Sequence, residues 1–152
     1  MAYHYATQVA NEHTARAVGK ELNISSKIAV EVCSYLRNRR LQDAKRRLGN
    51  VLAKQEAIPV KRYNFDLAHK KGGVGPGRYP IKTCKAILGI LESAEANAQF
   101  KGLNTSLLQI IHICSHNAGK SIHYGRRSGR EMKKTHVEVV VEEKGEKEEI
   151  KK

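Results

Sequence analysis

Apolar residues recur at helical spacing directly after residue 25. Ser25 and Ser26 are N-cap candidates, because their hydroxyl oxygens can accept hydrogen bonds from free backbone amides. The apolar positions that follow are Ile28, Val32, Tyr35 and Leu36. This spacing predicts a helix with one buried face. We expect the four residues 37–40 (RNRR) to form its C-terminal turn, where positive charge suits the negative end of the helix dipole.

A second amphipathic helix is predicted from Leu41 onwards. Its apolar stripe, at i, i+3, i+7, i+10 and i+11, consists of Leu41, Ala44, Leu48, Val51 and Leu52. Basic side chains project to the other side, and Pro59 stops the helix.

The longest helix is expected between Pro80 and Gly102. Proline is tolerated in the first turn of a helix, and glycine suits the position after its end. Alanines at 94, 96 and 98 keep the second half slim, which allows close approach to another element. The predicted stripe consists of Ile81, Cys84, Leu88, Leu91 and Ala98.

Three segments have patterns typical of β-strands. Residues 14–24 alternate loosely and suit an edge strand, whereas 107–114 (LLQIIHIC) and 136–142 (HVEVVVE) are β-branched runs. The stretch 115–135 between the last two has no apolar periodicity. It is either a floppy loop or a continuation of the two strands into an extended ribbon. Residues 61–79 are rich in glycine and predict a basic, irregular loop.

These elements predict an α+β fold, with three helices packed on a small antiparallel sheet and a long extended β-hairpin arm. We expect a single domain, 1–152, with its core at about 14–114 and 136–144. The arm would span about 107–142 with its tip at about 115–135. Residues 143–152 are expected to form a charged flexible tail.

Charge narrows the class of partner. The chain has 28 lysines and arginines against 15 acidic residues, a net charge of +13. Five of those acids lie in 142–152, so the positive excess belongs to the rest of the chain. Such an excess predicts a polyanionic partner. With no run of 18 apolar residues and no signal-peptide pattern at the N-terminus, we expect neither a membrane partner nor secretion.

The bases gather in three clusters, 37–47, 61–82 and 120–134, each with six bases and one acid. A surface that is merely soluble mixes the two signs, so the clusters predict phosphate contacts. The candidate RNA-binding residues are Arg37, Arg39, Arg40, Arg46, Arg47, Lys61, Arg62, Lys70, Lys71, Arg78, Lys82, Lys120, Arg126, Arg127, Arg130, Lys133 and Lys134.

Catalytic and metal-binding chemistry find little support. Residues 114–121 (CSHNAGKS) resemble a phosphate-binding loop, but Cys114 stands where its first glycine is needed and no helical pattern follows. On a strand, His112 and His116 would share one face about 13 Å apart, too far for one metal ion. Cys33 and Cys84, like Cys114, lack metal-ligand spacing and are expected in the core. We therefore expect no enzyme, cofactor or metal.

Four stretches resemble family twenty-two of the large-subunit ribosomal proteins. They are 24–27 (ISSK), 94–98 (AEANA), 126–130 (RRSGR) and 133–139 (KKTHVEV), and the likeness covers roughly residues 14–144. The insertion 61–79, with its Gly-Arg-Tyr-Pro ending, is similar to archaeal and eukaryotic members and is absent from bacterial ones.

The resemblance implies a structural constituent of the large subunit, cytoplasmic and ribosome-bound, whose hairpin lines the nascent-peptide exit tunnel. Expected partners are large-subunit rRNA, neighbouring large-subunit proteins and the nascent peptide. The implied tunnel tip consists of His123, Tyr124, Arg126, Arg127, Ser128, Gly129 and Arg130. The alternative is a DNA-binding helix–turn–helix at residues 25–54, which leaves the hairpin and the 61–79 loop unexplained.

Overall fold

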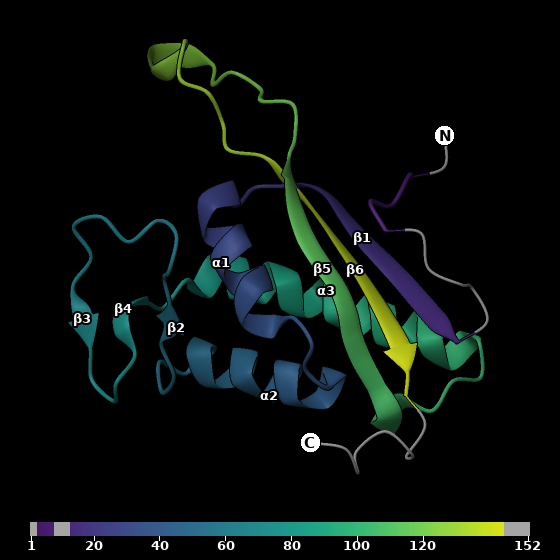
Figure 1. Ribbon diagram of the computed structural model, residues 1–152. Coiled ribbons are helices and arrows are strands. Elements are labelled where there is room, and N and C mark those ends of the chain that lie inside the picture. The colour runs from purple at the N-terminus through teal and green to yellow at the C-terminus, as the bar shows by residue number, and fades with distance from the viewer. Residues whose placement is uncertain (1–2, 8–12, 145–152) are drawn as a thin grey trace.

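The computed structural model describes residues 3–7 and 13–144. Its larger sheet is antiparallel, with strand order β1 (Thr14–Leu22), β6 (Thr135–Glu143) and β5 (Leu108–Asn117). Three helices, α1 (Ser26–Leu36), α2 (Leu41–Leu52) and α3 (Ile81–Phe100), complete the core (Figure 1). The predicted α+β class is confirmed, and β1 is an edge strand as expected. The tail predicted for 143–152 lies outside the described residues beyond Lys144.

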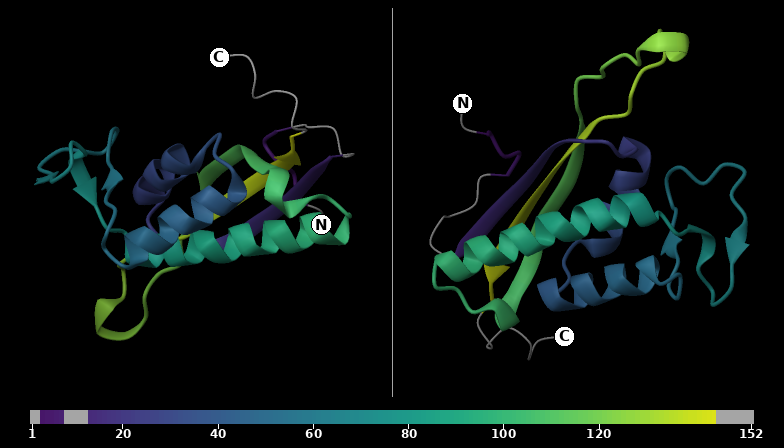
Figure 2. Two further views of the ribbon diagram at one scale, coloured as in Figure 1. Left: turned by 90° about the horizontal axis from the view of Figure 1, so that it is seen from below. Right: turned by 180° about the vertical axis from the view of Figure 1, so that it is seen from behind.

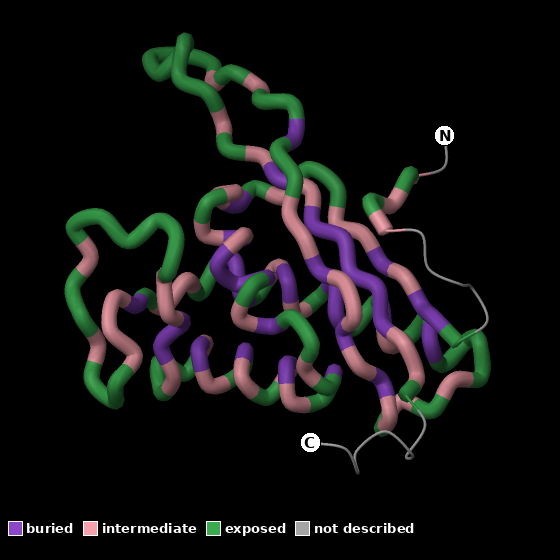
Figure 3. The backbone as a smooth tube through the Cα atoms, viewed as in Figure 1, coloured by how far each residue is buried: buried purple, intermediate pink, exposed green. Residues whose placement is uncertain are grey.

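The helices and the sheet enclose one hydrophobic core. Helix α3 crosses one face of the larger sheet, and α1 packs beside β5 (Figure 2). Buried positions run along the middle strand β6 and along the inner sides of the helices (Figure 3). The side of the sheet that faces away from α3 is called the outer face below. Among the described residues, no helix combines the length and apolar content of a membrane span.

The first two helices begin where the sequence predicts, but their ends differ. Ser25 is the N-cap of α1, yet its side chain makes no capping hydrogen bond. The helix ends at Leu36, so 37–40 form the link to α2 and not a basic last turn. On α2 the predicted stripe is buried, with Leu52 partly exposed. That helix ends at Leu52, well before Pro59.

Helix α3 has the predicted ends and a shifted buried stripe. Gly102 has φ +75°, and the amides of Gly102 and Leu103 donate to the carbonyls of Gln99 and Ala98, which is a Schellman motif. The stripe that reaches the core is Thr83, Cys84, Ile87, Ile90, Leu91, Ala94 and Ala98. The prediction of Ile81 in this stripe is wrong, because Ile81 is the first residue of the helix and is 41% exposed.

Strands β5 and β6 pair beyond their predicted ends and then separate. Their ladder runs out to Asn117 and Thr135, with an irregularity between Ile110 and His112. Beyond it, residues 118–134 project from the sheet (Figure 1) and hold one isolated bridge, Ile122 to Glu131. This projecting segment is not a regular ladder, so the predicted long β-hairpin arm is not confirmed.

Residues 61–79 are more ordered than the predicted irregular loop. Strand β4 (Gly75–Arg78) pairs with β2 (Ile58–Pro59) on one side and β3 (His69–Lys70) on the other. The turn between β3 and β4 contains Gly72 and Gly73 at φ +85° and +71°, a backbone region that glycine adopts without strain. The glycines that excluded a helix therefore build a tight turn in this small sheet.

A buried carboxylate on α1 fixes the start of this insertion. Glu31 is 5% exposed and accepts hydrogen bonds from the backbone amides of Lys61, Arg62 and Tyr63, at 3.1, 2.7 and 3.0 Å. Hydrogen bonds to a charged acceptor are stronger than neutral ones, and these link positions about 30 residues apart. The small sheet is thereby joined to α1.

Glu31→Ala should lower the free energy of unfolding by about 3 kcal/mol, because three amides lose a charged acceptor. Urea unfolding measures the loss, and hydrogen exchange should quicken at residues 61–63. Glu92→Ala, on the exposed side of α3, is the matched control and should change stability by about 0.5 kcal/mol or less. Equal effects of the two changes would contradict the anchoring role.

Candidate nucleic-acid interface

Two of the three predicted basic clusters meet at the start of α1. Three adjoining cavities, of about 200, 340 and 280 Å³, share Ser25 and Lys133 in their walls. We call this surface the α1 groove. Its basic residues are Lys27, Arg78, Lys82, Lys120, Lys133 and Lys134.

The α1 groove combines three sources of positive potential. Arg78 and Lys82 come from the insertion, whereas Lys133 comes from the projecting segment, more than 50 residues away in the chain. Lys27 adds a base that the sequence analysis did not single out. The N-terminal end of α1 also carries the positive end of the helix dipole. These features give a concave surface suited to phosphate oxygens.

The other predicted bases of the second cluster lie around the small sheet. Lys61, Arg62 and Lys71 are exposed there, and Lys70 lies with its ammonium 5.6 Å from the centre of the Tyr79 ring. The aromatic ring of Phe65 is 89% exposed beside them. An exposed aromatic side chain among bases suits stacking on an unpaired nucleobase.

The first cluster is different, because several of its guanidinium groups have internal partners. Arg47 donates to Asp43, Glu56 and the Tyr35 hydroxyl, at 3.0, 2.7 and 3.1 Å. Arg46, whose side chain is 74% exposed, also pairs with Asp43 at 2.6 Å.

The bases that link α1 to α2 are bound to backbone. Arg39 donates to the Tyr35 carbonyl at 2.8 Å, and Arg37 donates to the Ile113 carbonyl at 3.3 Å. The backbone of Arg40 forms an isolated β-bridge with Gln109. The structure does not bring this cluster to the α1 groove, and part of its charge holds α1, α2 and β5 together.

The tip of the projecting segment is open to solvent. A short 3-10 turn, Gly125–Arg127, is closed at its base by a hydrogen bond from the His123 amide to the Arg130 carbonyl at 2.9 Å. Tyr124 is 90% exposed, and the three arginines of the tip are exposed with Ser128 and Gly129. Of the seven predicted tip residues, His123 is partly buried.

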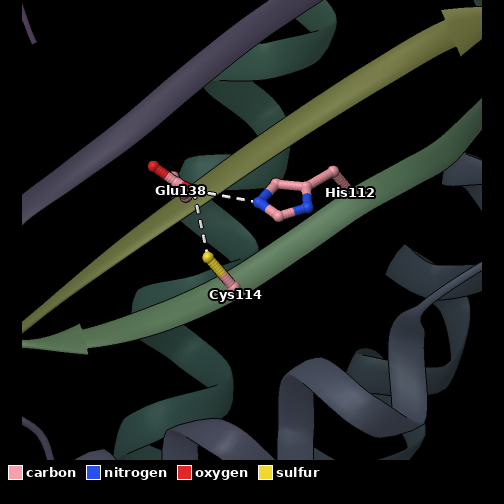
Figure 4. Close-up of side chains that lie close together, drawn as sticks. All are labelled: His112, Cys114 and Glu138. Carbon is pink, nitrogen blue, oxygen red and sulfur yellow. Dashed lines mark hydrogen bonds and ion pairs between the residues drawn. The ribbon is translucent and has the colours of Figure 1, made fainter. Parts of the chain in front are cut away.

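Sequence reasoning missed a polar cluster on the outer face. His112 and Cys114 on β5 both point to the carboxylate of Glu138 on β6 (Figure 4). The prediction that Cys114 is a core residue is therefore wrong, whereas Cys33 and Cys84 are buried as expected. The signal available in the sequence was the alternation His-x-Cys-x-His, which puts three ligand side chains on one face of a strand.

The buried carboxylate of Glu138 also holds the N-terminal segment. It accepts a hydrogen bond from the Ala6 amide at 3.1 Å, and Thr7 bonds to the His112 ring at 2.8 Å. Burial alone would raise the pKa of Glu138, but hydrogen bonds from Cys114, His112, Ala6 and Tyr3 hold it at about 2. Glu138 is thus ionised at neutral pH.

Comparison with known proteins agrees with this basic, non-catalytic architecture. The model of the family described as ribosomal protein L22p/L17e matches residues 17–142, most of the chain. The chain belongs to this family. The L22p/L17e proteins are ribosomal structural proteins and not enzymes, so the predicted absence of an enzymatic function is confirmed.

Curated relatives with the name large ribosomal subunit protein uL22 cover nearly the whole chain. The one from Ignicoccus hospitalis is 39% identical over 93% of this chain and 97% of its own length. Those from Methanosphaera stadtmanae and Methanocaldococcus jannaschii are each 40% identical, over 88% and 91% of this chain and 92% and 94% of their own lengths. These relatives are archaeal, which agrees with the likeness of the insertion to archaeal and eukaryotic members. Membership of the L22p/L17e family agrees with a ribosome-bound, cytoplasmic location.

The Arg47 network should make stability depend on pH in the acid range. Hydrogen bonds from Arg47 and Arg46 hold the pKa of Asp43 below its usual value. Burial would raise the pKa of Glu56, but bonds from Tyr35, Asn50 and Arg47 bring it below its usual value too. A carboxyl with a depressed pKa stabilises the fold above about pH 4, and this contribution is lost as the pH falls through the depressed pKa.

The free energy of unfolding should therefore fall between about pH 5 and pH 3. The Asp43→Asn variant should be less stable than the unchanged protein at neutral pH. Its free energy of unfolding should fall less on acidification, because the amide at position 43 does not titrate. Urea unfolding at a series of pH values measures both curves. If the two curves of stability against pH ran parallel, Asp43 would not contribute to the pH dependence.

Proposed function

We propose that this protein is a structural constituent of the large ribosomal subunit that binds large-subunit rRNA and supports assembly. The observation that carries the proposal is the α1 groove, in which bases from the insertion and the projecting segment meet. Family membership supports this reading over a DNA-binding helix–turn–helix. Neighbouring large-subunit proteins are the expected protein partners, and the proposal needs no cofactor.

The groove supplies positive charge where two RNA segments can approach each other. No acid among the described residues pairs with Lys27, Arg78 or Lys133 in the free protein, so these charges are available to phosphates. Phosphate contacts release condensed counterions, which makes such binding depend steeply on salt.

The projecting segment, 118–134, is proposed to reach into the subunit and to form part of the exit-tunnel wall. Its exposed tip, 123–130, would face either RNA or the passing nascent peptide. The support is its shape: it stands clear of the core (Figure 1) and carries three exposed arginines. A slender basic segment fits between RNA helices whose phosphates repel one another.

The triple change Lys27→Gln, Arg78→Gln and Lys133→Gln should weaken binding to large-subunit rRNA. The slope of log affinity against log salt should fall by about 2 to 3, because each lost phosphate contact contributes about 0.7 to 0.9. The matched control changes Lys20, Lys54 and Lys85 to Gln, which removes the same charge outside the groove. Filter binding over a salt series measures both slopes, and an equal fall in the control would reject the groove as the contact.

The tip is tested in ribosomes. Arg126, Arg127 and Arg130 changed together to Ala should leave binding through the α1 groove intact and should alter assembly of the large subunit or tunnel-dependent stalling. Sucrose-gradient profiles and the yield of a stalling reporter measure these effects. Normal profiles together with normal stalling would count against a role for the tip.

A further inference from the structure

Three potential metal ligands from one strand lie on the outer face beside a fully buried carboxylate. The irregularity between Ile110 and His112 resets the alternation of β5, so that Ile113 faces the core while His112, Cys114 and His116 face outward. On β6, Glu138 pairs with Cys114 and stands on the same face (Figure 4). Strand register thus brings all four side chains together.

The ligand atoms are close to one another. The distances to Glu138 Oε1 are 2.9 Å from His112 Nε2, 3.0 Å from Cys114 Sγ and 3.5 Å from His116 Nε2. Cys114 Sγ and His116 Nε2 are 2.9 Å apart. The expectation that His112 and His116 are too far apart used the backbone spacing, but both rings lean toward the same carboxylate oxygen. The ligand atoms of His112, Cys114 and Glu138 all lie within 4.8 Å of one another.

Hydrogen bonding alone leaves this cluster incompletely satisfied. Glu138 is 0% exposed, and its Oε2 atom has no hydrogen-bond partner among the described residues. Its ion-pair partners are the two imidazoles of His112 and His116. A buried carboxylate is ordinarily paired with a full positive charge or a metal ion.

The donor set has the chemistry of a zinc site. Two imidazole nitrogens, one sulfur and one carboxylate oxygen are all ligands of tetrahedral Zn²⁺. Around zinc, neighbouring ligand atoms stand about 3.4 to 3.6 Å apart. The Cys114–His116 pair at 2.9 Å and the contacts of Glu138 Oε1 with His112 and Cys114 at 2.9 and 3.0 Å therefore each need to open by about 0.5 to 0.7 Å. Rotation of the His116 ring, whose side chain is 45% exposed, opens the first of these, and the ion entering among the side chains has to open the other two.

We propose that His112, Cys114, His116 and Glu138 bind one zinc-class divalent cation on the outer face of the larger sheet. The Cys114 thiol transfers its proton to solvent on binding, and the thiolate then coordinates the ion. The site joins β5 to β6 at the root of the projecting segment. It also lies under the N-terminal segment, which contacts Glu138 and His112 through Ala6 and Thr7.

Cobalt(II) is the probe, because its spectrum reports both thiolate ligation and tetrahedral geometry. The full chain, stripped with a chelator and kept reduced, should bind one Co²⁺. A thiolate-to-cobalt charge-transfer band and strong visible d–d bands should appear, and one equivalent of Zn²⁺ should abolish both. Cys114→Ser should remove the charge-transfer band and weaken binding at least tenfold, and His116→Gln should weaken binding by a similar factor.

Two controls separate this site from incidental ligands. Cys84→Ala removes a core thiol, and His123→Gln removes an imidazole at the tip; both should leave the cobalt spectrum and affinity unchanged. Far-ultraviolet circular dichroism should show that each variant is folded. No charge-transfer band in the wild-type chain would overturn the proposal. Cobalt binding that persists unchanged in folded Cys114→Ser would overturn it too, because the ion would then sit elsewhere.

Discussion

The structure depends on inward-facing carboxylates in a chain whose surface is strongly basic. Glu31 and Glu138, 5% and 0% exposed, accept hydrogen bonds from segments that are distant in sequence. Asp43 and Glu56 form ion pairs with the guanidinium of Arg47. None of these four acids pairs with Lys27, Arg78 or Lys133 of the α1 groove or with the three arginines of the tip. The same few acids therefore hold the fold together and determine where the protein can meet a polyanion.

Local patterns predicted the helices and strands, because they depend on residues close together in the chain. The apolar stripe of α2 and the glycine that ends α3 are two features that the local sequence predicted correctly. The short strands within the insertion were not predicted, and the contact that fixes its start comes from Glu31, about 30 residues earlier in the sequence. The stripe of α3 was shifted for a related reason: nearly every turn offers an apolar residue, so only packing against β1 and α2 selects the buried side.

The candidate sites show the same division between local and tertiary information. Charge counts predicted the basic clusters, yet only the folded chain shows that two of them meet at Ser25 and Lys133. Composition equally could not show that Arg47 is held by acids. On the outer face, the estimate from strand spacing compared backbone positions along β5. It missed Glu138, which lies on the neighbouring strand and attracts both imidazoles.

The root of the projecting segment is more firmly fixed than its outer part. The Thr135 hydroxyl donates to the Ile24 carbonyl in the buried interior, and the Ala118 amide donates to the Lys134 carbonyl. Farther out, most side chains are exposed, and two bonds, His123 to Arg130 and Met132 to Ser121, close the backbone. Segments with so little buried apolar surface open at low free-energy cost. The core therefore sets the direction in which the segment leaves the sheet, whereas the outer part has few contacts that fix its conformation.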